Sequence, residues 1–452
     1  ARAAVANLLG APGASSVAFT NNATMALNIA IDGLLAPGQR ALTTAASHNS
    51  VLRPLFRLRD TAGCSVDIAP IAADGSLDFE TYAELLKHKP ALVAVTHASN
   101  LTGDVYDVVR MCAMAHEAGA KFVLDAAQTA GSYPLNMAEI GADVVCFTGH
   151  KSLLGPQGTG GLCVACGTEI APLLEGGSGT RSYDERHPLF MPERLEAGTL
   201  NAHGVAGLAA GIGYIEGTLG GPSGVHEHAG ALAQHFADAV SGISGVKVYG
   251  RSDACDRGSI VALNIADVDS AEVADRLASD YDICVRAGAH CAPLMHKALG
   301  TQSQGAVRFS FAAANTVADA DAAAEAVREI AHAVGQRFHL AETGVDLLQP
   351  FVDEPEGLAD ALVERLLQLL VHGHAHFFKL LAVVLLQRLQ PALHGGGEGG
   401  ELRLDALHPL ILHGELLLLR LGEDAVRFSD GGFELELVLL KALDQLAQAD
   451  VL

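Results

Sequence analysis

Short apolar runs alternate with amphipathic segments through the first 165 residues of the chain. Seven runs rich in Val, Leu, Ile and Phe predict β-strands, because they are too short for stable helices and end in polar turns. These runs are SVAF (16–19), RALTT (40–44), SVDIAP (65–70), ALVAVTH (91–97), KFVLDAA (121–127), DVVCFT (143–148) and GGLCVA (160–165). The segments between them, such as residues 24–35 and 107–119, repeat apolar positions with the period of an α-helix.

The regular alternation of strand and helix predicts an α/β fold with a mainly parallel, seven-stranded sheet. The strands are apolar along their whole length, so we expect helices to cover both faces of the sheet. In open sheets of this kind, ligands bind beyond the carboxyl ends of the strands. The polar residues that follow each strand are therefore the first candidates for a functional site.

A second pattern begins near residue 202, where long helices give way to a mixture of short strands and helices. Residues 202–243 predict two helices separated by GGPSG (220–224). Strands are predicted at 246–250, 259–266, 281–287 and 306–311, and helices near 270–279 and over 317–338. The predicted organisation is a large domain over 1–222, a smaller α+β domain over 223–340 and a third segment over 341–452.

Composition narrows the classes of function. The formal net charge of −23 argues against nucleic acid or an anionic membrane as a partner. No uninterrupted apolar run reaches the roughly 18 residues that a membrane span needs. The alanine-rich start predicts a helix that breaks at Gly10 rather than a secretory signal. Eight scattered cysteines, several of them within apolar strands, favour the reducing cytoplasm.

Two patterns resemble metal sites only weakly. Cys163 and Cys166 form a single CxxC with no second pair nearby, so we interpret both as buried strand residues rather than as a metal or redox site. The alternating His372, His374 and His376 lack a Cys or carboxylate partner. We therefore expect no metal site.

Polar residues gather after successive predicted strands. They are Thr20, Asn22 and Thr24 after the first strand, His48 after the second, Asn100 after the fourth, Asp125 and Gln128 at the end of the fifth, and Thr148, His150 and Lys151 at the end of the sixth. Small and hydroxyl residues at a helix N-terminus form an anion site. A lysine amine can bond to the aldehyde of pyridoxal phosphate, and a carboxylate keeps the pyridine nitrogen of this cofactor protonated. Each residue alone could be a helix cap or a satisfied loop residue, but the set together favours one pyridoxal phosphate site.

Several stretches of the sequence resemble the class V aminotransferase fold. They are FTGHKSLLGPQGTGGL (147–162), LDAAQTAG (124–131), THASNLTG (96–103), RLEAGTLN (194–201), RAGAHCAPLMHKALG (286–300) and GAVRFSFAAANT (305–316). Within that fold they are most similar to cysteine desulfurases and selenocysteine lyases of the SufS-like group. The resemblance covers about residues 1–338 and implies a PLP-dependent transferase fold of type I.

Carried over to the matching positions, the resemblance implies a role for each residue of the site. The resemblance implies that Lys151 forms the Schiff base, that Asp125 partners the pyridine nitrogen, and that His48 stacks on the ring and takes part in catalysis. It implies that Gln128 and Asn100 contact the phenolic oxygen, and that the phosphate is bound by Ala23, Thr24, Thr148 and His150. It also implies that Thr199 contacts the phosphate of the neighbouring subunit, and that Arg308 and Arg286 bind the substrate carboxylate. A planar guanidinium suits the last role because it can donate two parallel hydrogen bonds to a carboxylate. The role of Thr199 implies a homodimer.

Cys291 decides the subclass, because it matches the persulfide-forming cysteine that plain transaminases of this fold lack. Arg286 and His290 lie close to it in the sequence, and positive neighbours favour the thiolate. The implied reaction converts L-cysteine to L-alanine and leaves a persulfide on Cys291. The implied partner is a sulfur-acceptor protein in iron–sulfur cluster assembly or thiolation. By itself, Cys291 could also be a buried small apolar residue.

Two departures from the family pattern keep other functions open. The chain starts after the position of the LDNAATS-like segment that normally lines the active site, so we expect an N-terminal truncation. The loop after Lys151 is slightly longer than in the best-known desulfurases. One alternative is a selenocysteine lyase or another class V lyase or aminotransferase, and another is a truncated, non-catalytic remnant or partner subunit. Dependence of the reaction on Cys291 distinguishes a cysteine desulfurase from these lyases, because selenocysteine and sulfinates can fragment without a thiol acceptor.

The segment 341–452 has a different composition from the rest of the chain. Leucine makes up 31 of its 112 residues, and it gathers no polar groups for chemistry. We hypothesise that it is a frameshifted or opposite-strand translation of a GC-rich gene rather than a natural domain. Intact-mass analysis of the protein from its native organism should give a product that ends before this segment. A product that extends to Leu452 would contradict the hypothesis.

Overall fold

The computed structural model describes residues 1–251 and 257–353. A first compact unit, Ala1–Arg337, is separated by its contacts from the residues that follow it, and the candidate site lies within this unit. Most of the segment predicted over 341–452, including His372, His374 and His376, lies outside the described residues. Among the described residues, no helix combines the length and the apolar character needed to cross a membrane.

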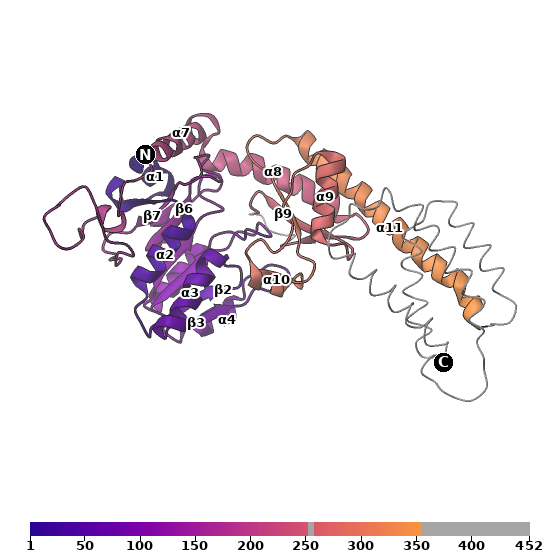
Figure 1. Cartoon of the computed structure of the whole chain (residues 1–452), viewed down its shortest axis with the longest axis horizontal. Coiled ribbons are helices and arrows are strands. Elements are labelled where there is room, and N and C mark those ends of the chain that lie inside the picture. Colours follow the sequence, from indigo (N-terminus) through magenta and orange to yellow (C-terminus); the bar gives the residue numbers. More distant parts are fainter. Residues whose placement is uncertain (252–256, 354–452) are drawn as a thin grey trace, which may run out of the picture. The chain divides into compact units, whose positions relative to one another are not determined.

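A seven-stranded sheet forms the centre of the first unit (Figure 1). Its strands are β1 (Val17–Thr20), β2 (Arg40–Thr44), β3 (Ser65–Ala69), β4 (Leu92–Thr96), β5 (Lys121–Asp125), β6 (Val144–Thr148) and β7 (Gly160–Val164). They lie in the order β1-β7-β6-β5-β4-β2-β3. All neighbours pair in parallel except β7, which runs antiparallel to β1 and β6. The predicted sheet and its seven strands are confirmed.

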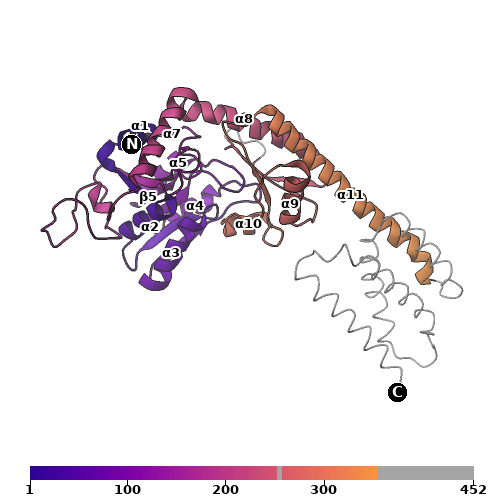
Figure 2. The same cartoon turned by 45° about the horizontal axis from the view of Figure 1, so that its top comes forward.

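Helices cover both faces of this sheet, as predicted (Figures 1 and 2). The helices α2 (Ala23–Leu34) and α3 (Asn49–Ala62) share one apolar core with strand residues such as Ala41 and Val123. The opposite core holds Leu42 and Phe122 together with α1 (Arg2–Leu9), α4 (Phe79–Leu86), α5 (Val108–Glu117), α6 (Met137–Ile140) and α7 (Ala202–Thr218). Successive strand residues point into opposite cores, which explains why these strands have no polar face.

Side-chain caps fix the two helices that begin beside the candidate site. Asn22 precedes α2, and its Oδ1 accepts a hydrogen bond from the Met25 N–H at 2.9 Å. His48 precedes α3, and its Nδ1 accepts from the Ser50 N–H at 3.0 Å. Each cap satisfies an N–H group that has no partner within the first turn of the helix. The sequence after these two strands therefore sets where each helix starts.

A three-stranded antiparallel sheet forms the second part of the unit. Its strands β8 (Val246–Tyr249), β9 (Ile260–Ile265) and β10 (Val307–Ser310) lie in the order β10-β9-β8. They pack in one core with α8 (Gly221–Ser241), α9 (Ser270–Tyr281) and α11 (Val317–Asp353). The short helix α10 (Pro293–Leu299) follows the loop that contains Cys291. The predicted small α+β fold is confirmed.

Three details of the second part differ from prediction. Residues 281–287 do not form a strand, since Asp282 adopts a left-handed conformation (φ 56°) and only Arg286 makes an isolated bridge. Most of the predicted GGPSG break belongs to α8, because Pro222 occupies the first turn, where a helix needs no N–H donor. The last helix extends to Asp353 rather than ending near residue 338.

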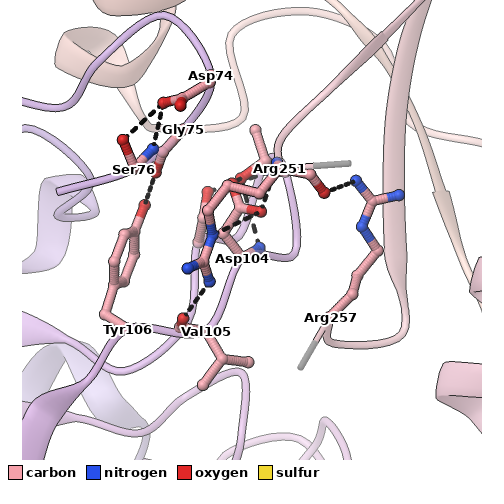
Figure 3. A network of polar contacts seen from close by, with 10 residues as sticks. Asp74, Gly75, Ser76, Asp104, Val105, Tyr106, Arg251 and Arg257 are labelled. Carbon is pink, nitrogen blue, oxygen red and sulfur yellow. Dashed lines mark hydrogen bonds and ion pairs between the residues drawn. The ribbon is translucent and has the colours of Figure 1, made fainter. Parts of the chain in front are cut away.

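A buried carboxylate connects the two sheets (Figure 3). Asp104, in the loop after β4, is fully buried, and its Oδ1 accepts a hydrogen bond from the Arg251 N–H at 2.9 Å. Its Oδ2 accepts from the Thr102 hydroxyl at 2.7 Å. The Arg251 guanidinium donates to the Val105 carbonyl at 2.7 Å, and Arg257 donates to the Arg251 carbonyl at 3.1 Å. Asp104 thus holds the start of the β8–β9 connection against the large sheet.

We expect Asp104→Ala to lower the free energy of unfolding by about 3 kcal/mol, because it leaves the Arg251 N–H and the Thr102 hydroxyl without their acceptor and removes the carboxylate nearest the Arg251 guanidinium. Asp107→Ala is the matched control. Asp107 is exposed and caps α5 by accepting from the Arg110 N–H at 3.0 Å, so its loss should cost about 1 kcal/mol. Urea denaturation followed by circular dichroism measures both values. Equal losses for the two variants would contradict the role given to Asp104.

Candidate active site

The parallel pairing of the large sheet places the predicted site residues at one edge. Asp125 is the last residue of β5 and pairs in register with Thr96 on β4 and with Cys146 on β6. Thr148 ends β6, and His150 and Lys151 follow it within three residues. The carboxyl ends of parallel strands meet at the same edge of a sheet, so residues far apart in sequence meet there.

Lys151 lies at the centre of this group. Its side chain reaches solvent, but neighbouring atoms displace enough water to lower its pKa. Arg308 and Arg286 lower the pKa further, while Asp125 and Cys291 oppose that change. All four groups therefore lie close enough to Lys151 to affect its charge.

Asp125 is buried, with 5% of its surface exposed. One carboxylate oxygen accepts a hydrogen bond from the Ala127 N–H at 3.0 Å. Burial raises the pKa of Asp125, and the Ala127 N–H and the Lys151 charge only partly offset this effect. A buried carboxylate of this kind gains from a cationic N–H donor placed against it.

His48 carries no charge at neutral pH. Burial is the main cause that lowers the pKa of His48 to about 4, and the nearby charges of Lys151 and Arg286 add to it. Its Nδ1 is held by the Ser50 N–H and lies 2.9 Å from the Ser50 hydroxyl. Ser50 in turn shares a hydrogen bond of 2.7 Å with Thr24, so the imidazole is joined to the start of α2.

A small cavity of about 260 Å³ lies beside these groups. It is lined by Asn21, Asn22, His150, Gln157 and Gly158. The Thr148 hydroxyl and the His150 Nδ1 share a hydrogen bond of 3.0 Å at the end of β6. The cavity therefore adjoins the N-terminal end of α2, where free N–H groups attract an anion.

Gly160 makes this close approach possible. A Cβ at Gly160 would lie 2.7 Å from the backbone of Asn22, so a larger residue would displace the cap of α2. Gly160, Ser50, Gln157 and Gly158 are not among the site residues that the sequence predicts. Ser50 and the two loop residues carry no distinctive pattern, and only the fold brings them to the site.

Arg308 and Arg286 form a cationic pair whose charge reaches Lys151. Their backbones make an isolated bridge, and the Arg286 charge helps burial to lower the pKa of Arg308. One Arg308 Nη donates to the Asn100 carbonyl at 2.8 Å, while its Nε is buried without a hydrogen-bond partner in the described part of the chain. Two neighbouring guanidinium groups with unused donors fit an incoming carboxylate.

The loop that carries Cys291 is held by both sheets. Cys291 is exposed, and its carbonyl accepts a hydrogen bond from the Asn49 N–H at 2.9 Å. The Asn100 side-chain amide donates to the His290 carbonyl at 2.6 Å. Burial lowers the pKa of His290 to about 4, so His290 is neutral and does not supply the positive charge expected beside Cys291. Of the two predicted cationic neighbours, only Arg286 carries a charge.

The other predicted residues occupy less central positions. Ala23 is buried as the first residue of α2, and Gln128 is half-buried in the turn after β5. Thr199 is exposed just before α7, so its role toward a second subunit stays a prediction. For the CxxC pattern, Cys163 is a buried strand residue as predicted, whereas Cys166 is exposed in the turn after β7, which corrects that interpretation.

The residues present fit pyridoxal phosphate. The fit rests on the buried Asp125 for the pyridine nitrogen, the amine of Lys151, and the Asn22-capped end of α2 for the phosphate. A buried Asn100 Oδ1 without a hydrogen-bond partner in the described residues marks a further polar surface within the site. These groups differ in chemistry, yet all of them lie at or just after the carboxyl ends of strands of the large sheet.

Comparisons with known proteins agree with this geometry. The family described as Aminotransferase class-V matches residues 1–323. A protein named "Probable cysteine desulfurase" from Methanothermobacter thermautotrophicus is 35% identical over 341 residues, which cover 73% of this chain and 83% of the relative. "Cysteine desulfurase CsdA" from Escherichia coli is 32% identical over 338 residues, covering 72% and 81%.

Two solved structures of cysteine desulfurases are also similar to this chain. The apo structure of a cysteine desulfurase from Thermococcus onnurineus is similar with a TM-score of 0.68 and 32% identity, over 74% of this chain and 83% of that one. The crystal structure of CsdA from Escherichia coli, with an S-sulfonic acid, has a TM-score of 0.67 and 30% identity, over 73% and 82%.

We expect Arg308→Gln to raise the pKa of Lys151, because the Arg308 charge disfavours a second positive charge nearby. The Lys151 amine reacts with acetic anhydride only when deprotonated, so the midpoint of its acetylation should move to higher pH. Mass spectrometry of the cofactor-free protein measures the modification. Arg40→Gln, which removes the Arg40–Asp67 ion pair, is the control and should leave the midpoint unchanged. A midpoint that stays fixed or falls in Arg308→Gln would contradict the assignment.

Proposed function

The chain belongs to the class V aminotransferase family, and we propose that it is a pyridoxal-phosphate-dependent cysteine desulfurase. It converts L-cysteine to L-alanine and transfers the sulfur to Cys291. One observation carries the proposal: Lys151 lies within electrostatic reach of a buried carboxylate, a cationic pair and an exposed cysteine. Plain transamination needs the first three of these, and desulfuration also needs the cysteine.

The residues around Lys151 would each contact a different part of the cofactor. Lys151 would bond to its aldehyde, and Asp125 would partner its pyridine nitrogen. His48, as a neutral imidazole, would stack on the ring, while Gln128 and Asn100 would contact the phenolic oxygen. Ala23, Thr24, Thr148 and His150, at the end of β6 and the start of α2, would hold the phosphate group. When bound, the cofactor supplies a protonated ring that accepts the electrons left on the substrate Cα.

Arg308 and Arg286 hold the substrate carboxylate. Because the two guanidinium groups repel each other, a bound carboxylate relieves their repulsion and is itself oriented by the planar donors. Lys151 then removes the proton from the substrate Cα. Its lowered pKa leaves a larger fraction of the amine neutral, as a general base requires.

Cys291 receives the sulfur. Its thiolate attacks the substrate Sγ, and a sulfur–sulfur bond forms while the Cβ–Sγ bond breaks. The electron pair of the broken bond stays with Cβ, which takes up a proton and becomes the methyl group of alanine, and the protonated Lys151 amine returns a proton to Cα. The products are L-alanine and a persulfide on Cys291, which a sulfur-acceptor protein can take up for iron–sulfur cluster or thiolation pathways.

We propose a homodimer as the working form. The segment before α7 exposes Tyr183, Leu189 and Phe190, and these large apolar side chains favour burial against a second copy of the chain. Thr199, close by in the sequence, is exposed and available to the partner's phosphate site. The seven described cysteines are all free thiols, which supports a cytoplasmic location.

Alanine released from L-cysteine by the cofactor-loaded protein tests this function, with the absorbance of the cofactor recorded on the same sample. Lys151→Ala should lose both the cofactor band and the alanine, because it removes the covalent anchor and the base. Cys291→Ser should keep the band and lower alanine formation by about 100-fold or more, since a hydroxyl cannot accept sulfur.

Cys284→Ser is the matched control, because Cys284 is also an exposed free thiol on the same segment. It should behave as the unaltered protein. Full alanine formation in Cys291→Ser would favour a selenocysteine lyase or another lyase that needs no thiol. Absence of both the band and alanine in the unaltered protein would favour a non-catalytic remnant.

A further inference from the structure

We propose that His290 is a positioning residue, which fixes the Cys291 thiol relative to the substrate-binding Arg308. The inference rests on the proposed function. It gives His290 a role different from the cationic one that its place next to Cys291 suggests.

The backbone around Cys291 adopts a conformation that side chains disfavour. His290 and Cys291 have φ angles of 50° and 56°, so two consecutive residues with a Cβ lie in the left-handed region. Such a pair persists only where surrounding contacts hold it in place. The loop therefore needs anchors, and each anchor determines where the Cys291 thiol lies.

The imidazole of His290 supplies the anchor toward the small sheet. It is 2% exposed, and its Nε2–H donates to the Ala306 carbonyl at 2.9 Å. The Ala306 N–H donates back to the Gly288 carbonyl at 3.2 Å, so the two segments are bonded twice. Ala306 directly precedes β10, which carries Arg308. The His290 side chain thus adds a bond to the backbone bonds that join residues 286–288 to the strand of Arg308.

A second imidazole keeps this ring in place. The ring of His296, on α10, is stacked on that of His290 with centroids 5.9 Å apart and planes inclined by 10°. Its Nδ1 is bonded to the Thr301 hydroxyl at 2.7 Å. The His290 ring is therefore fixed both in its plane, by the Ala306 carbonyl, and from its face, by His296.

A residue in the loop after β4 of the large sheet bonds to both His290 and Arg308. Asn100 donates its side-chain amide to the His290 carbonyl at 2.6 Å and accepts from Arg308 through its own carbonyl at 2.8 Å. Arg308 and His290 consequently share one partner in the loop after β4. Movement of the Cys291 loop away from Arg308 would break the bond of His290 to Ala306 and the bond of Asn100 to His290.

The chemistry explains why that distance matters. In L-cysteine the carboxylate and the sulfur lie at opposite ends of a short molecule, so a thiol that attacks the sulfur must be placed relative to the arginine that holds the carboxylate. L-Cysteine sulfinate presents the same carboxylate and the same Cα proton. Its Cβ–S bond breaks with release of sulfur dioxide, and the electron pair on Cβ takes up a proton without any thiol acceptor. Only the first substrate depends on where Cys291 lies.

The test compares two variants that differ in which ring nitrogen they replace. Gln places an amide nitrogen near the position of Nε2, while Asn places one near Nδ1, so His290→Gln can keep the bond to Ala306 and His290→Asn cannot. His228→Asn is the matched control, since the Nε2 of His228 also lies 2.8 Å from a backbone carbonyl, that of Asn315, but its side chain is exposed. Alanine formation from each substrate is measured on the cofactor-loaded full chain.

We expect His290→Asn to lower kcat for L-cysteine by about tenfold or more, and kcat for L-cysteine sulfinate by less than about twofold. His290→Gln should recover most of the lost activity toward L-cysteine, and His228→Asn should match the unaltered protein on both substrates. Equal losses on the two substrates would overturn the proposal, because they would indicate damage to the cofactor site or the fold. Unchanged activity of His290→Asn toward L-cysteine would overturn it as well.

Hydrogen exchange separates this inference from the proposed function. The backbone amides over residues 286–292 should exchange faster in His290→Asn than in the unaltered protein, and should keep their rates in His290→Gln and His228→Asn. If the unaltered protein formed no alanine from L-cysteine, the proposed function would fail while the exchange experiment still judged the anchor. Unchanged exchange in His290→Asn would overturn the anchoring role of His290 whatever the activity.

Discussion

The backbone register between β5 and β6 is the constraint on which the candidate site depends. Asp125 ends one strand and pairs in register with Cys146 on the next, and that next strand leads directly to Lys151. Loss of water disfavours the charged form of both groups, so burial raises the pKa of Asp125 and lowers that of Lys151. Each charge partly offsets the penalty of the other. A slip of one residue would send their side chains to opposite faces and remove this compensation.

The remaining chemistry comes from the second part of the unit, so the site also depends on how the two sheets are joined. Asp104 holds the β8–β9 connection through Arg251, and Asn100 holds the Cys291 loop and Arg308. Both residues lie in the loop after β4. One loop of the large sheet therefore bonds to the part of the unit that holds the small sheet, and it also positions Cys291 and Arg308.

Much of this arrangement could be predicted from the sequence. The seven strands, the parallel sheet and the strand-end residues follow from periodicity, and the role of each residue came from a resemblance whose motifs are specific. The errors have local physical reasons. Residues 281–287 have the composition of a strand, but Asp282 adopts a left-handed conformation that the apolar pattern does not reveal. Proximity in sequence suggested a charged His290, whereas burial makes it neutral. Ser50 and Gly160 carry no signal of their own, because only tertiary packing gives them a function.

The central claim is that Cys291 accepts sulfur from the substrate, and the mass of the enzyme tests it most directly. The cofactor-loaded protein is treated with L-cysteine in the absence of a reductant and then digested for peptide mass spectrometry. We expect the peptide with Cys291 to gain the mass of one sulfur atom, while the peptides with the other exposed thiols, Cys166 and Cys284, should not. Alanine formation without any added sulfur on Cys291, or with sulfur on another cysteine, would contradict it.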